Sequence, residues 1–279
     1  MLVGGAAAGV FGSLLGLGGG VLIVPLLTLG FGLDLRAAVG VSLVSVIVTS
    51  SAAAGVYLER NVANLRLGMT LELFTAIGAL IGGLVAFLIE ERVLALLFAL
   101  LLGYVALSMA RAGASAGRAA PVAVGDGSVP DPDSLPAVVE PTGPTSRAAE
   151  RLSGPDYTVR NLGRGVAGSV GAGVISALLG VGGGIVKVPL MHLALGVPMR
   201  VATATSNLMI GITAAASAVI YLLRGEIDPY VAGPTAIGVF IGATIGSRVA
   251  HRIDLGVLRT LFVVVLLYTA FQMLLRGLR

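Results

Sequence analysis

The sequence predicts an all-α membrane protein that crosses the bilayer several times and is built from two homologous repeats. Of its 279 residues, 56% are hydrophobic and only 11% are charged, whereas soluble domains contain about 25% charged residues. Apolar runs of roughly 20 residues, the length of a membrane-spanning helix, recur along almost the whole chain. Helix is the open-ended structure that satisfies its own backbone inside lipid. A water-soluble enzyme is therefore excluded.

The two ends of the chain carry the same pattern. Residues 164 apart match without a gap, so residues 14–20 (LLGLGGG) align with residues 178–184 (LLGVGGG). Chance matches in a glycine- and leucine-rich sequence would align glycines or leucines. They would not align a mixture of residue types in one register. The matched pairs include Pro25 with Pro189, Arg36 with Arg200, Ser42 with Ser206, Thr49 with Thr213, Tyr57 with Tyr221 and Arg60 with Arg224.

Each repeat is predicted to contain a glycine-broken pair of half-helices followed by three transmembrane helices. The first repeat occupies residues 1–110 and the second residues 165–279. The broken segments are 3–31 and 167–196, and the expected helices are 37–58, 68–89 and 93–110, then 201–223, 231–250 and 257–275. Glycines spaced four apart, such as Gly78 and Gly82, are expected to let the third segments pack closely.

A segment of different composition, residues 111–164, separates the repeats. It holds seven of the 12 prolines and equal numbers of arginines and acidic residues, six of each. Such a stretch buries too little apolar surface to offset its ordering entropy, which predicts a disordered linker. Arginines near the segment ends place this linker in the cytoplasm.

The broken segments leave two topologies open. If each turns back as a re-entrant hairpin of two half-length pieces, about 11–13 residues each, every repeat has three full spans and the repeats are inverted. If each crosses the membrane, every repeat has four spans and the repeats are parallel. The inverted topology places ten of the arginines near segment ends on one side of the membrane and five on the other. The parallel topology places nine on one side and six on the other. We favour the inverted topology because half-length helices around glycine breaks recur in such transporters.

The motif GxGGGxxxxP occurs once in each repeat, ending at Pro25 and at Pro189. Adjacent glycines disfavour a helix interior by about 1 kcal/mol each, so they indicate unwound backbone. The half-helix that follows offers free N–H groups and a positive dipole end, which favour an anion. A packing crossover without a ligand is the alternative. The candidate anion-binding glycines are Gly18, Gly19, Gly20, Gly182, Gly183 and Gly184.

Polar residues near the breaks extend this candidate site. Lys187 is the single lysine among 18 basic residues and follows the second glycine cluster. A cation within a membrane segment indicates a functional site unless it snorkels to the interface. The next helix carries hydroxyl and amide groups that bind an oxyanion or tie helices together. These candidates are Ser42, Thr49, Thr203, Ser206, Asn207 and Thr213.

The remaining ionisable residues indicate no further site. Glu72 and Arg248 lie slightly inside their segments. Snorkelling to the interface is the expected role of both, and gating of a path is the alternative. His192 is expected to be a hydrogen-bonded structural histidine, and a proton carrier is the alternative. The chain has no cysteine and only two histidines, which argues against metal centres and cysteine chemistry. We expect no cofactor, no enzymatic activity and no nucleic-acid partner.

The paired motifs resemble the TauE/SafE-type sulfite exporter family. The likeness covers both repeats, and LGLGGGVLIVPLL and LGVGGGIVKVPLM carry it. The resemblance implies a multi-pass permease of a bacterial or archaeal inner membrane. Its implied substrates are sulfite, organosulfonates and similar small anions. The long proline-rich linker departs from the short connection that is usual in the family.

Together these features predict a secondary transporter that holds a small anion near the membrane midplane, between the two GxGGG breaks. Sulfite or an organosulfonate is the expected anion. Alternating access would follow from rocking of one repeat against the other. A passive anion channel and a non-transporting scaffold subunit are the alternatives. The coupling ion, proton or sodium, and the oligomeric state, with a homo-oligomer included, remain open at this point.

Overall fold

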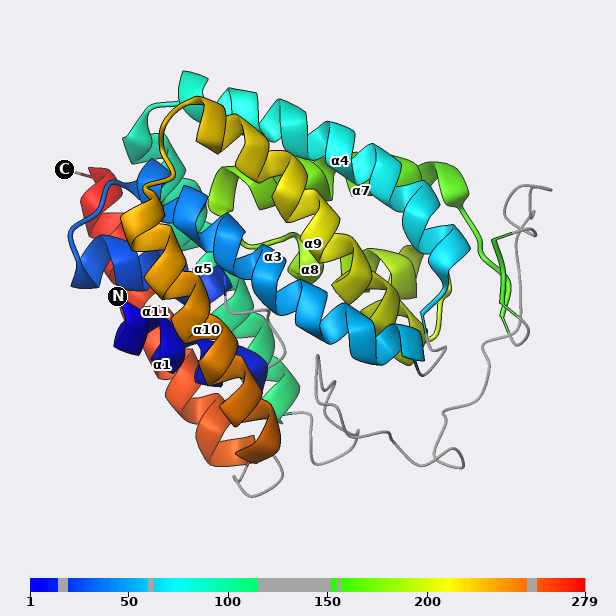
Figure 1. Ribbon diagram of the computed structural model, residues 1–279. Helices are drawn as coiled ribbons and strands as arrows, with labels where there is room; N and C mark the ends of the chain where they lie inside the picture. The colour runs from blue at the N-terminus through cyan, green and yellow to red at the C-terminus, as the bar shows by residue number, and fades with distance from the viewer. Residues whose placement is uncertain (15–19, 60–62, 115–151, 155–156, 250–254, 279) are drawn as a thin grey trace.

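Helices make up nearly all of the described chain (Figure 1). The computed structural model describes all residues except 15–19, 60–62, 115–151, 155–156, 250–254 and 279. The elements are α1 Leu2–Leu14, α2 Gly20–Pro25, the π-helix η1 Leu26–Gly30, α3 Leu35–Glu59, α4 Leu65–Leu88, α5 Glu91–Ala114, α7 Leu162–Leu179, α8 Gly184–Pro189, the π-helix η3 Leu190–Ala194, α9 Met199–Leu223, α10 Pro229–Val249 and α11 Leu255–Leu278.

The prediction of an all-α membrane protein is confirmed. Within the described chain, five helices are long and apolar enough to cross a membrane, and each glycine break is followed by three long helices, as expected. Element bounds recur at the same sequence offset that aligns the two motifs. For example, α3 spans Leu35–Glu59 and α9 spans Met199–Leu223.

Equivalent helices of the two halves run antiparallel, which is the arrangement that an inverted repeat requires. In Figure 1, α3 and α9 cross the molecule in opposite directions. The contacts agree, because residues near the start of one helix meet residues near the end of its counterpart. Gly40 of α3 meets Tyr221 of α9, Ser50 meets Gly211, and Glu91 of α5 pairs with Arg276 of α11 at 3.6 Å.

In both halves the segment that carries the glycine break doubles back as a hairpin, so that its two ends lie close together. In the second half, the Arg160 amide donates to the Leu195 carbonyl at 3.0 Å, so the end of η3 lies beside the start of α7. In the first half, Gly4 of α1 contacts Phe31, just after η1. The expected half length is wrong for α7, which has 18 residues and a length of about 27 Å. Its return arm, α8 with η3, has the expected half length.

Glycines join the halves through two closely packed helix pairs, α1 with α10 and α4 with α7. A Cβ atom on Gly82 of α4 would lie 2.6 Å from the Val174 carbonyl oxygen of α7. On Gly5 of α1, it would lie 2.6 Å from the Thr235 carbonyl oxygen of α10. The predicted packing role of the spaced glycines is therefore confirmed.

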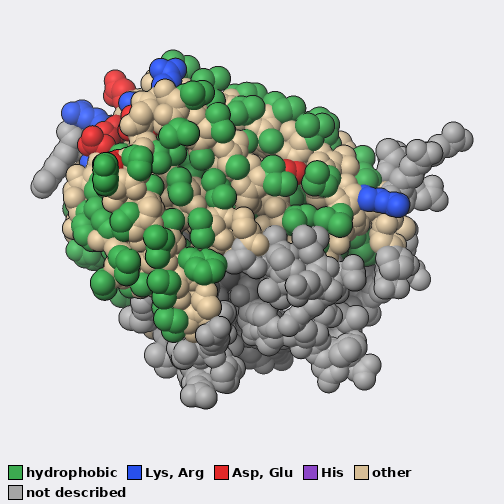
Figure 2. All heavy atoms as spheres, viewed as in Figure 1, with side chains coloured by type: hydrophobic (Ala, Val, Ile, Leu, Met, Phe, Trp, Pro, Cys, Tyr) green, Lys and Arg blue, Asp and Glu red, His purple; other side chains and the backbone are tan. Residues whose placement is uncertain are grey.

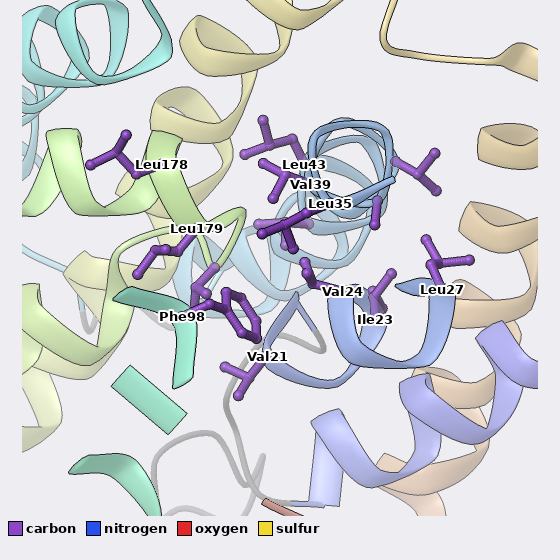
Figure 3. Packing of buried hydrophobic residues seen from close by; sticks show 14 of the residues in the cluster. Val21, Ile23, Val24, Leu27, Leu35, Val39, Leu43, Phe98, Leu178 and Leu179 are labelled. Atoms are coloured by element: carbon purple, nitrogen blue, oxygen red, sulfur yellow. The ribbon is translucent and has the colours of Figure 1, made fainter. Parts of the chain in front are cut away.

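Hydrophobic side chains form both the core and much of the surface. Figure 3 shows part of the main buried cluster, in which Val21, Ile23 and Val24 of the first hairpin lie near residues of α3, α5 and α7. On the face in Figure 2, hydrophobic side chains cover the middle and most charged ones lie near the ends. A bilayer core accommodates such a surface.

The last residues of the predicted linker pack against the helices. Asn64, which caps α4, donates through Nδ2 to the Leu152 carbonyl at 2.8 Å and to the Tyr157 hydroxyl at 2.7 Å. Val159 is fully buried in a second cluster with residues of α4, α8 and α9. Residues 152–154 and 157–161 thus belong to the folded body, while residues 115–151 lie outside the described residues.

Candidate functional site

The second glycine cluster is unwound, as predicted. Gly180, Gly182 and Gly183 have φ angles of 67°, 78° and 76°, the left-handed region that residues with a Cβ disfavour. α7 therefore ends at this cluster and α8 begins directly after it. Pro189 then lacks the N–H that a continuing α-helix needs, and the chain passes into the π-helix η3.

Lys187 of α8, Glu72 of α4 and Thr213 of α9 form a closed polar triad. Lys187 Nζ lies 3.1 Å from Glu72 Oε2 and also donates to Thr213 Oγ1. Thr213 Oγ1 in turn donates to Glu72 Oε1 at 2.6 Å. Because α4 belongs to the first repeat and α8 and α9 to the second, this triad connects the two repeats.

The triad lies inside the protein and not at its surface. Lys187 and Glu72 are only 1% and 3% exposed. Snorkelling is therefore ruled out for Lys187, and the expected interfacial role of Glu72 is wrong. A buried charge is tolerated when it is paired and its hydrogen-bonding groups are satisfied. Each of these two side chains supplies the partner that the other requires.

The first repeat has an apolar counterpart at this position. Ile23, Thr49 and Ala236 occupy the positions equivalent to Lys187, Thr213 and Glu72. Ile23 is fully buried in the main hydrophobic cluster and Ala236 is 7% exposed. The two hairpins are thus similar in shape but different in charge, so a polar site at this level belongs to the second hairpin.

Three buried serine hydroxyls near the second hairpin have no hydrogen-bond partner among the described residues. They are Ser169 and Ser176 of α7 and Ser206 of α9. A Cβ atom on Gly183 would lie 3.2 Å from the Ser176 Cβ and 3.5 Å from the Lys187 Cε. One on Gly184 would lie 3.7 Å from the Ser206 hydroxyl oxygen. Unpaired buried polar groups are rare in folded proteins and indicate an unfilled role.

The two hairpins meet at Ser42 of α3. Its hydroxyl donates to the Gly180 carbonyl at 2.8 Å and lies 3.3 Å from the Gly20 carbonyl. Ser42 thus bridges the glycine breaks of the two repeats. Its equivalent, Ser206, has no such bond within the described part of the chain. This difference between equivalent residues makes Ser206 the better candidate for binding a ligand.

The other predicted site residues lie in several settings. The Thr49 hydroxyl contacts backbone carbonyls of its own helix, including that of Ser45 at 3.1 Å. Thr203 is buried and Asn207 is half-buried. Gly18 and Gly19 lie outside the described residues. His192 Nδ1 is 2.9 Å from the Val197 carbonyl oxygen, which agrees with the structural role expected for it.

Sequence reasoning missed Glu72, Ser169 and Ser176. A signal for these residues was available in the sequence, because each of them differs from the residue aligned with it in the other repeat. The aligned residue is an alanine for Glu72 and a glycine for each serine. Lys187 departs in the same way. Three of these polar residues, Lys187, Glu72 and Ser176, lie close together beside the second hairpin.

The chemistry of this place is that of ionic and hydrogen-bonding recognition. It offers an ammonium group, a carboxylate and several hydroxyls, and these groups bind or release a small ion without covalent change. In the described part of the chain, no group of three or more histidine, aspartate or glutamate residues is arranged to hold a metal ion.

Comparison with known proteins shows what the chain is similar to. Residues 1–273 match the family described as Sulfite exporter TauE/SafE. A curated relative, the probable membrane transporter protein YunE of Bacillus subtilis (strain 168), is 24% identical over 289 residues. That alignment covers 99% of this chain and 97% of the relative. No solved structure matches the chain.

Proposed function

The chain belongs to the sulfite exporter TauE/SafE family, whose members are membrane permeases, and we propose that its cargo is a small sulfur oxyanion, sulfite or an organosulfonate. In this proposal the anion binds beside the second hairpin, where Lys187 supplies the positive charge. Ser169, Ser176 and Ser206 supply hydrogen bonds to its oxygens.

The observation that carries this proposal is the combination of a buried ammonium with unpaired buried hydroxyls. Leaving a buried hydroxyl unpaired costs about 1–3 kcal/mol, so a bound acceptor recovers free energy at each of these serines. Hydrogensulfite and the sulfonate group each carry one negative charge and three oxygens. Among the described residues, the Lys187 ammonium complements the negative charge of such an anion, and the three serine hydroxyls match its three oxygen acceptors.

The six-residue helix α8 contributes little to this site through its dipole. A macrodipole requires several aligned turns of helix, and α8 ends at Pro189, where η3 begins. The predicted attraction of an anion to the two half-helix ends is therefore replaced, in our proposal, by the side-chain charge of Lys187. The glycine cluster then serves mainly to bring α8 close to the serines of α7.

Burial of the triad favours a carrier over an open channel. Lys187 is 1% exposed, so the side chain that would hold the anion is closed off from water in this conformation. Because the triad joins α4 of the first repeat to α8 and α9 of the second, rocking of the repeats would open and close it. Alternating access around such a site is the common mode of inverted-repeat transporters.

The test is uptake of radiolabelled sulfite and of methanesulfonate into proteoliposomes containing the purified protein. We expect saturable uptake that is lost in Lys187→Ala and in Gly183→Leu, whose side chain would enter the space next to Ser176 and Lys187. Arg66→Ala, which changes an exposed cation on α4, is the control and should transport normally. Transport that is indifferent to both site variants would contradict the proposal, and a current set by the anion gradient alone would indicate a channel.

A further inference from the structure

We propose that Glu72 couples anion movement to proton movement by occupying Lys187 when the substrate is absent. This inference rests on the proposed function, because it describes how the same site exchanges its ligands. In the structure the carboxylate takes the place that an anionic substrate would take beside the ammonium, with Oε2 3.1 Å from Lys187 Nζ.

The hydrogen bonds of the triad make this exchange specific. Among the described residues, Lys187 is the partner of Glu72 Oε2 and Thr213 is the partner of Oε1. Lys187 uses two of its three N–H donors on Glu72 and Thr213, and the charged carboxylate repels an anionic substrate that approaches the ammonium. Uptake of a proton by Glu72 removes the charge that holds Lys187, and the neutral acid still bonds to Thr213. The substrate anion then becomes the counter-ion of Lys187.

The charges balance in each step. The empty site holds an ammonium and a carboxylate, and the loaded site holds an ammonium, an anion and a neutral carboxylic acid. One proton enters Glu72 for each monoanion that binds, and no covalent bond to the substrate forms or breaks. Both forms of the site have zero net charge, so movement of one proton with one monoanion is electroneutral. A membrane potential should therefore have little effect on the rate.

A proton fits this role better than sodium. A sodium ion needs several oxygen ligands and would have to approach a carboxylate whose oxygen lies 3.1 Å from an ammonium nitrogen. Repulsion between two cations at such a distance is strong in a buried site. A proton attaches to the carboxylate itself and removes the attraction between the two groups.

No other ionisable group of the described residues is as well placed as Glu72. The elements packed around the triad are α4, α7, α8 with η3, and α9. The Tyr221 hydroxyl donates to the Ala177 carbonyl, and His192 contacts the Val197 carbonyl. Apart from Glu72, the described ionisable side chains on these elements are Arg66 of α4, Arg164 of α7, Lys187 of α8, His192 of η3 and Tyr221 of α9.

The experiment measures methanesulfonate binding to the purified protein across a pH series by ligand-induced thermal stabilisation. Methanesulfonate stays a monoanion throughout, so any proton taken up belongs to the protein. If binding requires one proton, affinity should fall about tenfold for each pH unit above neutrality in the unmodified protein. Glu72→Gln should lose this slope over the pH range in which Lys187 keeps its charge. Glu90→Gln, which changes an exposed carboxylate just after α4, should keep the slope.

A second measurement needs no variant and so does not depend on how Glu72→Gln folds. Proteoliposomes with a pH dye inside receive an inward methanesulfonate gradient, and we expect the lumen to acidify as the anion enters. Binding without a pH slope, acidification that is absent during uptake, or an unchanged slope in Glu72→Gln would overturn the coupling role while leaving the anion site intact. Failure of the protein to bind or move any sulfur oxyanion would instead overturn the proposed function.

Discussion

Lys187 combines two properties that rarely occur together, because it is the only lysine of the chain and it is almost completely buried. The sequence alone indicated its importance, since a cation between apolar residues in a membrane segment costs free energy unless it is paired. The identity of the pair was not predictable. Glu72 is 115 residues away, and only the packing of α4 beside the second hairpin brings the two charges together.

A double-mutant cycle measures how strongly these charges depend on each other. Lys187→Met leaves a buried carboxylate without its cation, which should lower the free energy of unfolding in detergent by about 3–5 kcal/mol. Adding Glu72→Gln should restore most of that stability while transport stays absent. If the stability loss of the double variant equals the sum of the losses of the two single variants, the two side chains do not interact.

The equivalent serines Ser42 and Ser206 provide a matched pair. Ser42→Ala removes a 2.8 Å bond to the Gly180 carbonyl and should lower stability by about 1–2 kcal/mol. Ser206→Ala removes a hydroxyl without a partner among the described residues. It should leave stability unchanged or raise it, and weaken anion binding by about tenfold, the equivalent of one hydrogen bond. A stability loss in Ser206→Ala with normal binding would assign this hydroxyl a structural role.

At the scale of the elements, hydrophobicity predicts most of the helices and the glycine clusters predict where they break. α7 is longer than expected because it begins at Leu162, five residues before residue 167, where the broken segment was predicted to start. Small residues such as Gly165, Gly168 and Gly171 lie within it. In the structure the first two lie against side chains of η3 and the residue after it. Close helix packing explains these glycines better than unwinding of the helix. A packing glycine is distinguished from an unwinding glycine only by its contacts in the structure.

Two glycine substitutions test the packing of helix pairs. Gly82→Ala puts a methyl group within 2.6 Å of the Val174 carbonyl oxygen, so α4 and α7 must separate. Overpacking of this kind should cost about 1–3 kcal/mol. Gly103→Ala in α5 has no atom within 4 Å of the added Cβ and should stabilise the helix by about 0.5–1 kcal/mol. Thermal unfolding in detergent compares them, and equal effects would argue against the close α4–α7 contact.

For the molecule as a whole, the gapless alignment of the two repeats predicted the equivalence of the elements but not their relative orientation. Arginine counts of ten against five and nine against six hardly separated inverted from parallel repeats. The contacts between equivalent helices supply what was missing. With antiparallel equivalents, the start of α3 and the start of α7 lie at opposite ends of the bundle.

Cysteine labelling tests this topology directly because the natural chain has no cysteine. Asp34→Cys before α3 and Thr158→Cys before α7 change exposed residues in connections. A membrane-impermeant maleimide should label Asp34→Cys from outside intact cells and Thr158→Cys only after the cells are opened, since the arginine-rich side faces the cytoplasm. Labelling of both from the same side would contradict the inverted arrangement.

The most direct measurement of the proposed anion site is equilibrium binding of radiolabelled sulfite to the purified protein and to two variants. We predict saturable binding that is lost in Lys187→Met and retained in Ile23→Met, which changes the equivalent residue of the first hairpin. Sulfite bound equally well by Lys187→Met and the unmodified protein would contradict the claim that this buried lysine holds the transported anion.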